Sequence, residues 1–382
     1  MIALLASFAV AVLVEGNPQA AAELNNQATR LHAQAHYAEA EQLYQQALQA
    51  AVKAGPSAAR TRAVTSGNLG ALLHLTGRYS EAVRLLTDSV RQLQSDPSTP
   101  GPDLARMLGN LASAYQAQGD LPRAEAAVRQ ANEVCPSDCE APARDRINLS
   151  LLQAAIDVDQ HRYAEAEAIL RQILSSATGQ QSVLSYNSLS VIALSKGAYA
   201  ESEELARTAL DRAGSSIPRE HPLFAMVLNN LAQACRFQGK YLEAETDYRQ
   251  AIEIWETVVG PSHPDVAKGL MNLAGFYHER GREAGAEDLY VRSAAIFERT
   301  PGPKTPFLLV ARNELADVLR AERRYSESEK LGQVSLQAME KSFPAGDSRL
   351  LRALGNRARL LAETRRQTEA NALLARISRS FQ

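Results

Sequence analysis

The chain has 382 residues, of which 45% are hydrophobic and 22% charged, and its formal net charge is −2. This balance is typical of a folded protein and gives no long-range attraction for nucleic acid, so we expect no nucleic-acid partner. Aromatic residues make up only 5% and alanine is abundant, and small side chains of this kind favour closely packed helices.

The first fourteen residues are apolar and carry no charge. A helix that spans a bilayer needs about 20 residues, so this segment is too short to cross a membrane but fits the core of a signal peptide. Val14-Glu15-Gly16 and Ala20-Ala21-Ala22 offer cleavage positions, although the usual basic segment before the core is missing. Residues 1–20 are predicted to be either a signal peptide, which makes the protein periplasmic or extracellular, or an N-terminal helix of a cytoplasmic protein.

An internal repeat runs through the rest of the chain and is marked most clearly by tyrosine. Successive marker tyrosines are 42 or 84 residues apart, except for one step of 36. Leu121, Glu283 and Gln367 occupy the same position in the remaining repeats, which gives nine repeats in all. The marker tyrosines are Tyr37, Tyr79, Tyr163, Tyr199, Tyr241 and Tyr325.

Each repeat also has a small residue at two fixed positions. Nine residues before the marker stand Ala28, Gly70, Ala112, Ala154, Ser190, Ala232, Ala274, Ala316 and Ala358. Three residues after it stand Ala40, Ala82, Ala124, Ala166, Ser202, Ala244, Ala286, Ser328 and Ala370. Small side chains let two antiparallel helices approach closely, so each repeat is predicted to be a helical hairpin. The turns are expected near residues 36, 78, 120, 162, 198, 240, 282, 324 and 366.

Glycine marks the expected turn in five repeats, because the chain leaves the first helix through a left-handed conformation that glycine adopts easily. These glycines are Gly77, Gly119, Gly197, Gly239 and Gly281. In the fourth and ninth repeats His161 and Arg365 replace the glycine, and the match to the pattern is weaker there. A glutamate near the start of the second helix in seven repeats suits the positive end of the helix dipole.

The stretch Asn230-Leu231-Ala232 followed by Gly239-Lys240-Tyr241-Leu242-Glu243-Ala244 closely resembles the tetratricopeptide repeat. The 42-residue period and the linker 260–267 resemble the longer repeat of kinesin light chains and their bacterial relatives. The resemblance covers residues 21–382 and implies an all-α fold, an α-solenoid (superhelix) of about nine helical hairpins in one continuous array. The step of 36 predicts a local change of curvature near residues 175–181.

The sequence contains no recognisable catalytic motif, so we expect no enzymatic activity, no cofactor and no small-molecule substrate. His278-Glu279 is followed by Arg280-Gly281, which does not continue a zinc-protease motif. His32 and His36 have a spacing that suits a metal on a helix, but we expect them to be polar residues that face the solvent. His221-Pro222 and His263-Pro264 are interpreted as helix starts.

Asparagine recurs two residues before the small residue of the first helix, at Asn26, Asn68, Asn110, Asn230, Asn272 and Asn356. In the family that the sequence resembles, this stripe lines the concave groove. A side-chain amide can donate to and accept from the backbone of an extended peptide, so a peptide-binding ladder is favoured over asparagines that only cap or solvate the helix. The predicted groove residues are Asn68, Asn110, Asn187, Asn229, Asn230, Gln233, Lys268, Asn272 and His278.

These observations predict a non-enzymatic scaffold that binds an extended, neutral or slightly acidic segment of a partner protein. Alanine at both Asn230 and Asn272 is expected to weaken binding while leaving the melting temperature nearly unchanged. The alternative is a structural or assembly factor that acts through its convex faces or terminal repeats, including self-association, in a larger and membrane-associated complex.

The chain has three cysteines. Cys135 and Cys139 are four residues apart in an expected loop and are predicted to form a disulfide in an oxidising compartment. No further ligands for zinc stand near them in the sequence. Cys235 falls within an apolar helical pattern and is predicted to be a core residue.

Overall fold

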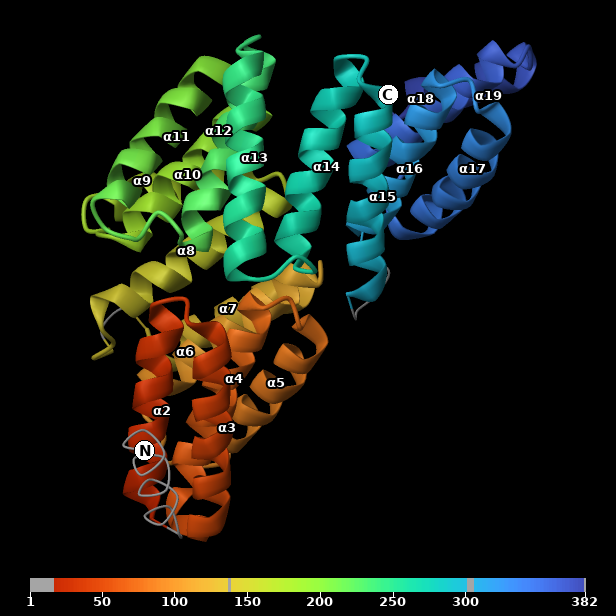
Figure 1. Cartoon of the computed structure of the whole chain (residues 1–382). Helices are drawn as coiled ribbons and strands as arrows, with labels where there is room; N and C mark the ends of the chain where they lie inside the picture. The colour runs from red at the N-terminus through yellow and green to blue at the C-terminus, as the bar shows by residue number, and fades with distance from the viewer. Residues whose placement is uncertain (1–16, 137–138, 301–305, 381–382) are drawn as a thin grey trace, which may run out of the picture. The chain divides into compact units, whose positions relative to one another are not determined.

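The computed structural model describes residues 17–136, 139–300 and 306–380, and these segments consist of helices joined by short turns (Figure 1). The helices alternate as the first and second members of nine hairpins, here called A and B helices. The A helices are α2 (Pro18–Ala33), α4 (Ala59–Leu75), α6 (Gly101–Ala117), α8 (Ala143–Asp159), α10 (Gln180–Ser195), α12 (Pro222–Phe237), α14 (Pro264–Glu279), α16 (Pro306–Ala321) and α18 (Ser348–Glu363). The B helices are α3 (Tyr37–Ala54), α5 (Tyr79–Gln94), α7 (Leu121–Val134), α9 (Tyr163–Leu174), α11 (Tyr199–Gly214), α13 (Tyr241–Val258), α15 (Glu283–Arg299), α17 (Tyr325–Ser342) and α19 (Gln367–Arg379), and a short 3-10 helix, η1 (Gly55–Ala58), follows α3.

The predicted all-α solenoid and the nine predicted turns are confirmed, because every B helix begins at the marker position of its repeat. The packing divides the chain into two compact units, Met1–Phe224 and Ala225–Gln382, with the division inside α12. They are called the N-terminal unit and the C-terminal unit below. The predicted leader segment, residues 1–16, lies outside the described residues.

Within each unit the A helices form a continuous row. In the N-terminal unit α2 contacts α4, α4 contacts α6, α6 contacts α8 and α8 contacts α10, and in the C-terminal unit α14 contacts α16 and α16 contacts α18. Within either unit, no two B helices pack against each other among the described residues. Because neighbouring A helices are in contact and neighbouring B helices are not, each row of hairpins bends toward its A helices. The A helices therefore line the inner, concave face of each unit.

The small residues lie where the two helices of each hairpin meet. All nine of the second-helix positions and all nine of the first-helix positions are buried, and Ala232 and Ala244 have no exposed surface. At Gly70 an added Cβ would lie 2.7 Å from Cγ of Leu86, closer than carbon atoms pack. The prediction that these columns allow close helix contact is therefore confirmed.

All nine turns use the same left-handed residue two positions before the B helix. The five predicted glycines have φ between 68° and 79°. Ala35, His161, Arg323 and Arg365 hold the corresponding position in the other four hairpins with φ of 62° or 63°. The weaker repeats therefore keep the turn geometry, although a residue with a Cβ adopts it less readily than glycine.

Both histidines of the His-Pro pairs start a helix, and their side chains contribute directly. Nδ1 of His263 accepts a hydrogen bond from the backbone N–H of Asp265 at 3.1 Å. Nδ1 of His221 accepts one from the N–H of Leu223, also at 3.1 Å. Each imidazole thus satisfies a backbone donor that the first turn of a helix leaves unpaired. The sequence predicted the helix starts but not this role of the imidazole.

Arginine residues just before the B helices form ion pairs with the preceding hairpin. In five places an arginine pairs with a glutamate 37 residues earlier, which stands directly after the small residue of the preceding B helix. The nitrogen–oxygen distances lie between 2.5 and 3.0 Å. These pairs are Arg78–Glu41, Arg162–Glu125, Arg282–Glu245, Arg324–Glu287 and Arg366–Glu329.

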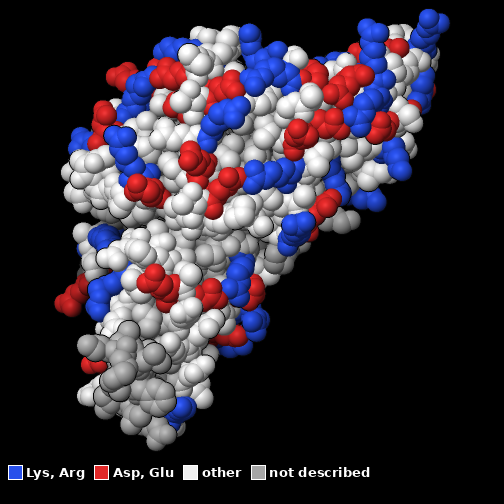
Figure 2. Space-filling view, viewed as in Figure 1, with Lys and Arg blue, Asp and Glu red and all other residues white. Residues whose placement is uncertain are grey.

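Charged side chains of both signs are interspersed on the face of the molecule shown in Figure 2. None of the helices in the described part of the chain is both long enough and apolar enough to cross a membrane. The first described helix, α2, starts at Pro18, and the side chain of Asn17 caps it by accepting from the N–H of Gln19 at 2.9 Å.

Candidate functional site

The inner face of each A helix is a stripe of four positions, six and two residues before the small residue and one and five residues after it. In the C-terminal unit most of these side chains are less buried than the apolar residues between them. We call this set the inner stripe. Its members there are Met226, Asn230, Gln233, Phe237, Lys268, Asn272, Gly275, Glu279, Val310, Glu314, Asp317, Ala321, Arg352, Asn356, Arg359 and Glu363.

Four of the predicted groove residues form one chain of hydrogen bonds across α12 and α14. Nδ2 of Asn272 donates to Oδ1 of Asn229 at 3.0 Å. Asn229 in turn donates to Oδ1 of Asn230 at 3.4 Å, and Gln233 donates to the same oxygen at 3.5 Å. The last two bonds are long and weak, whereas the bond between the helices has ordinary length.

The N-terminal unit contains a second copy of this arrangement. Nδ2 of Asn68 on α4 donates to Oδ1 of Asn25 on α2 at 3.0 Å. Asn25 donates to Oδ1 of Asn26 at 3.5 Å, and Arg106 of α6 donates to Oδ1 of Asn68 at 3.0 Å. In both copies an asparagine pairs with another one that stands 43 residues later, so the A helices contact each other with an offset of one residue per repeat.

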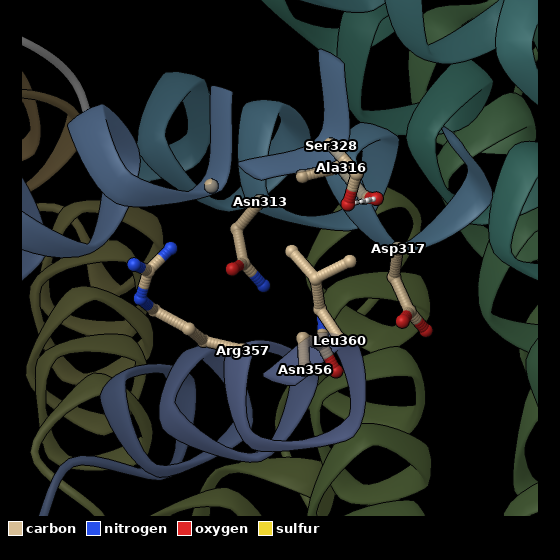
Figure 3. Close-up of a pocket in the computed structure, with 8 residues that line it drawn as sticks. Asn313, Ala316, Asp317, Ser328, Asn356, Arg357 and Leu360 are labelled. Atoms are coloured by element: carbon tan, nitrogen blue, oxygen red, sulfur yellow. Dashed lines mark hydrogen bonds between the residues drawn. The ribbon is translucent and has the colours of Figure 1, made fainter. Parts of the chain in front are cut away.

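A third pair of this spacing, Asn313 and Asn356, lies between α16 and α18 (Figure 3). The two amides line a cavity of about 10 Å³, together with Asp317 and Arg357. Such a cavity has room for a single water molecule. Asn356 Nδ2 and Arg357 Nη1 are buried and have no hydrogen-bond partner among the described residues. Arg357 occupies a position where most repeats have leucine, which explains why this hairpin interface is polar.

The recurring asparagines therefore have a structural role that the sequence did not reveal. Asn68, Asn187 and Asn229 are at most 9% exposed, so their amides serve mainly the packing between helices. Asn110 and Asn272 are only half-buried on the inner stripe. Asn272 uses one N–H in the bond to Asn229, and Asn110 makes no hydrogen bond with any described residue. These two amides keep hydrogen-bonding groups that no described residue uses.

The remaining predicted groove residues have charged partners. His278 is half-buried, with Nδ1 2.5 Å from Oε2 of Glu283 and Nε2 3.2 Å from Oδ2 of Asp317. Its hydrogen bonds to Asp317 and Glu283 raise the pKa of His278 above its usual value, although burial acts in the opposite direction. Lys268 pairs with Asp265 at 3.0 Å and lies over the ring of Phe307.

The expectation that His32 faces the solvent is wrong. His32 is half-buried, and its Nδ1 lies 3.3 Å from the hydroxyl of Tyr44. Burial lowers the pKa of His32 to about 4. His36 is exposed and lies 3.7 Å from Glu39, so the two histidines of the i, i+4 pair have separate partners.

Ion pairs between neighbouring A helices form part of the inner face, and the sequence analysis missed them. Nε of Arg236 donates to Glu279 at 2.7 Å, and Nη1 of Arg320 donates to Glu363 at 2.6 Å. Both pairs have the 43-residue spacing of the asparagines. Asp317 lies beside the second pair, and hydrogen bonds from His278 and Arg320 hold its pKa at about 2 even though burial alone would raise it. The 42-residue period does not give the one-residue offset between A helices that brings these partners together, so the sequence carried no clear signal for them.

The cysteines lie at two separate places. Cys135 and Cys139 are joined as a disulfide just after α7, with Cα atoms 5.4 Å apart, within the range that a disulfide requires. Cys235 is not part of a disulfide and has no exposed surface, as predicted for a core residue.

The repeat geometry and the paired inner helices define a class of protein, and comparison with known families agrees with it. The chain belongs to the tetratricopeptide-repeat family: one model of this repeat matches residues 61–137, 223–299 and 265–341, and a second matches residues 151–217. None of the curated proteins that were compared matches the chain.

Among solved structures, the chain is similar to a Rap protein complexed with competence and sporulation factor, with 14% identity and a TM-score of 0.68 over 95% of this chain and 98% of that one. It is also similar to NprR in complex with its cognate peptide NprX, with 13% identity and a TM-score of 0.52 over 72% of this chain and 78% of that one. A putative kinesin light chain from Podosopora anserina with TPR-like repeats is 22% identical, with a TM-score of 0.43 over 51% of this chain and 93% of that one. The first two likenesses support the α-solenoid fold.

Proposed function

We propose that this protein is a non-enzymatic scaffold whose inner face binds an extended segment of a partner protein. The observation that carries the proposal is the set of half-buried amides on the inner stripe, represented by Asn110 in the N-terminal unit and by Asn272 in the C-terminal unit. Each amide retains hydrogen-bonding groups toward the inner face. Because an amide both donates and accepts, it can pair with a peptide backbone whatever the sequence of the peptide.

The similar solved structures add support. The Rap protein is complexed with competence and sporulation factor, and NprR is complexed with its cognate peptide NprX. The second of these proteins therefore holds a peptide, which is the kind of ligand proposed here. The inner stripe of the C-terminal unit has three basic and four acidic side chains, which suits a neutral segment better than the slightly acidic one that the sequence suggested. Each neutral hydrogen bond contributes about 0.5–1.5 kcal/mol.

The alternative, an assembly factor that uses its outer faces, has less support. Large apolar side chains on the B helices are exposed mostly at single positions, such as Val52 at 61%, and Leu242 at 84% has Tyr241 at 42% beside it. Isolated exposed apolar residues are ordinary on soluble proteins and do not define an interface. Self-association through these outer faces would appear as a crosslinked product that contains only this chain.

A crosslinking pull-down with mass spectrometry tests the proposal. Wild-type protein is compared with Asn110→Ala, which removes a half-buried inner amide that has no hydrogen bond to the described residues. The matched control is Asn132→Ala, an exposed asparagine on the B helix α7. We expect recovery of partner peptides to fall at least several-fold for Asn110→Ala only.

Circular dichroism melts of both variants establish that the difference does not come from unfolding. Equal recovery from all three proteins would contradict binding at the inner face. A crosslinked product that contains only this chain would favour self-association instead.

A further inference from the structure

A cavity of about 200 Å³ lies between α16 and α18 in the C-terminal unit. Val310 and Glu314 of α16 line one side, Met339 of α17 forms part of the lining, and Ser348 and Arg352 of α18 line the other side. It is larger than a cavity of about 150 Å³ that takes up benzene, so it can accept an amino-acid side chain. Val310, Glu314 and Arg352 all belong to the inner stripe, so the cavity belongs to the proposed binding face.

Glu314 occupies the position at which six other repeats have asparagine. It is half-buried, and among the described residues it accepts a hydrogen bond only from Nδ2 of Asn313, at the long distance of 3.4 Å. Glu314 forms no ion pair with any residue that the structure describes. Asp317, three residues later, differs in having His278, Arg320 and Arg359 as partners.

The environment of Glu314 disfavours its charged form, because burial raises its pKa. Arg352 lowers that pKa from a distance but does not form an ion pair with the carboxylate. The other lining arginine, Arg349, is already held by two hydrogen bonds to Asp347, at 2.9 and 2.6 Å. The carboxylate therefore lines the cavity with Arg352 nearby but with no ion-pair partner among the described residues to offset its loss of hydration.

We infer that this cavity receives a lysine or arginine side chain from the bound segment, with Glu314 as its counter-ion. The inference rests on the proposed function and adds one specific contact to it. Val310 and Met339 would pack against the aliphatic part of the entering side chain, while its charged end reaches the carboxylate. A ligand cation supplies the partner that Glu314 lacks, and this contact distinguishes segments by sequence, which backbone recognition by amides cannot do.

The test uses the full chain and a positional-scanning library of dodecapeptides, in which each pool has one residue fixed at one position. We expect the wild-type protein to retain pools with lysine or arginine fixed at a single position. Glu314→Gln should reduce that enrichment at least tenfold, because glutamine keeps the size of the side chain but not its charge. The matched control is Glu340→Gln on α17, which removes a carboxylate that pairs with Arg376 at 2.7 Å.

Three other results would overturn the inference, and they separate it from the proposed function. Binding of peptides without any preference for a basic residue would refute the role of Glu314 and leave the scaffold intact. Selection of acidic residues that is lost in Arg352→Gln would assign the cavity to an anion. If the wild-type protein retains no pool at all, peptide binding itself fails, and the inference fails with it. Circular dichroism of Glu314→Gln ensures that a folded protein is compared.

Discussion

Arg324 binds Glu287 of the preceding hairpin, with Nη1 2.8 Å from both carboxylate oxygens. The same guanidinium also holds Glu327 of its own helix, with Nε 2.9 Å from Oε1. One side chain therefore links the start of α17 to α15. The glutamate at the start of the B helix, which the sequence assigned to the helix dipole, has this arginine as a second partner.

Replacing Arg324 by glutamine should lower the free energy of unfolding only slightly, because these charges are exposed to solvent and screened by it. The loss should shrink in 1 M NaCl, where screening is stronger. Urea unfolding of Arg324→Gln, Glu287→Gln and the double variant measures the coupling. Lys330→Gln, an exposed residue of the same helix, is the control. A coupling energy that is equal at low and high salt would contradict an electrostatic link.

Arg323→Gly should stabilise the protein. Arg323 has φ of 62°, a left-handed conformation that costs a residue with a Cβ roughly 1–2 kcal/mol but costs glycine little, so we expect a net gain of about 0.5–1 kcal/mol. The gain is reduced by the greater freedom of glycine in the unfolded chain. Gly239→Ala is the reciprocal change, at φ of 78°, and should destabilise by a similar amount. Thermal melts compare the two variants, and a lower melting temperature for Arg323→Gly would refute the assigned strain.

Asn272→Ala should destabilise the protein as well as weaken ligand binding. It leaves Oδ1 of the buried Asn229 without its hydrogen bond from Asn272, and we expect a loss of about 1–3 kcal/mol. This differs from the expectation drawn from the sequence, in which replacing Asn230 and Asn272 leaves the melting temperature nearly unchanged. Asn110→Ala should have little effect on urea unfolding. Equal stability of the two variants would argue against the interhelical amide bond.

The pH dependence of stability should contain a contribution from His32. Its folded-state pKa of about 4 lies below the ordinary value of 6.5, so the unfolded chain binds the proton more readily. The contribution is present above pH 6.5 and is lost as the pH falls toward 4, by on the order of 1–3 kcal/mol. His278 acts in the opposite sense, because its raised pKa gives stability below 6.5 that is lost as the pH rises through the folded value.

Urea unfolding of wild type and His32→Gln at pH 7.5 and pH 5 isolates this contribution. Glutamine retains a hydrogen-bonding group near the hydroxyl of Tyr44. The wild-type protein should lose more stability between the two pH values than the variant does. If both proteins lose the same amount, the imidazole does not stay neutral in the folded state.

The hairpins could be predicted from the sequence because each one depends on contacts within a single repeat. Ala232 and Ala244 are twelve residues apart in the chain and mark the contact between two consecutive helices. The partners on the inner face could not be predicted in the same way. The bond from Asn272 to Asn229 depends on the offset between A helices, which the 42-residue period does not reveal. The raised pKa of His278 depends on its hydrogen bond with Asp317 in the next hairpin. Glu314 has no such charged partner among the described residues and lines a cavity to which α17 and α18 also contribute.

Contacts in the described part of each unit join a hairpin to itself or to the next hairpin. Such an array behaves as a one-dimensional chain of elements in which terminal hairpins can open without disturbing distant ones. A peptide that lies across three A helices would tie together hairpins that otherwise share no contact. Its binding energy would then oppose the local unfolding of every hairpin that it contacts. The ligand would therefore make the opening of these hairpins cooperative, in addition to being bound by them.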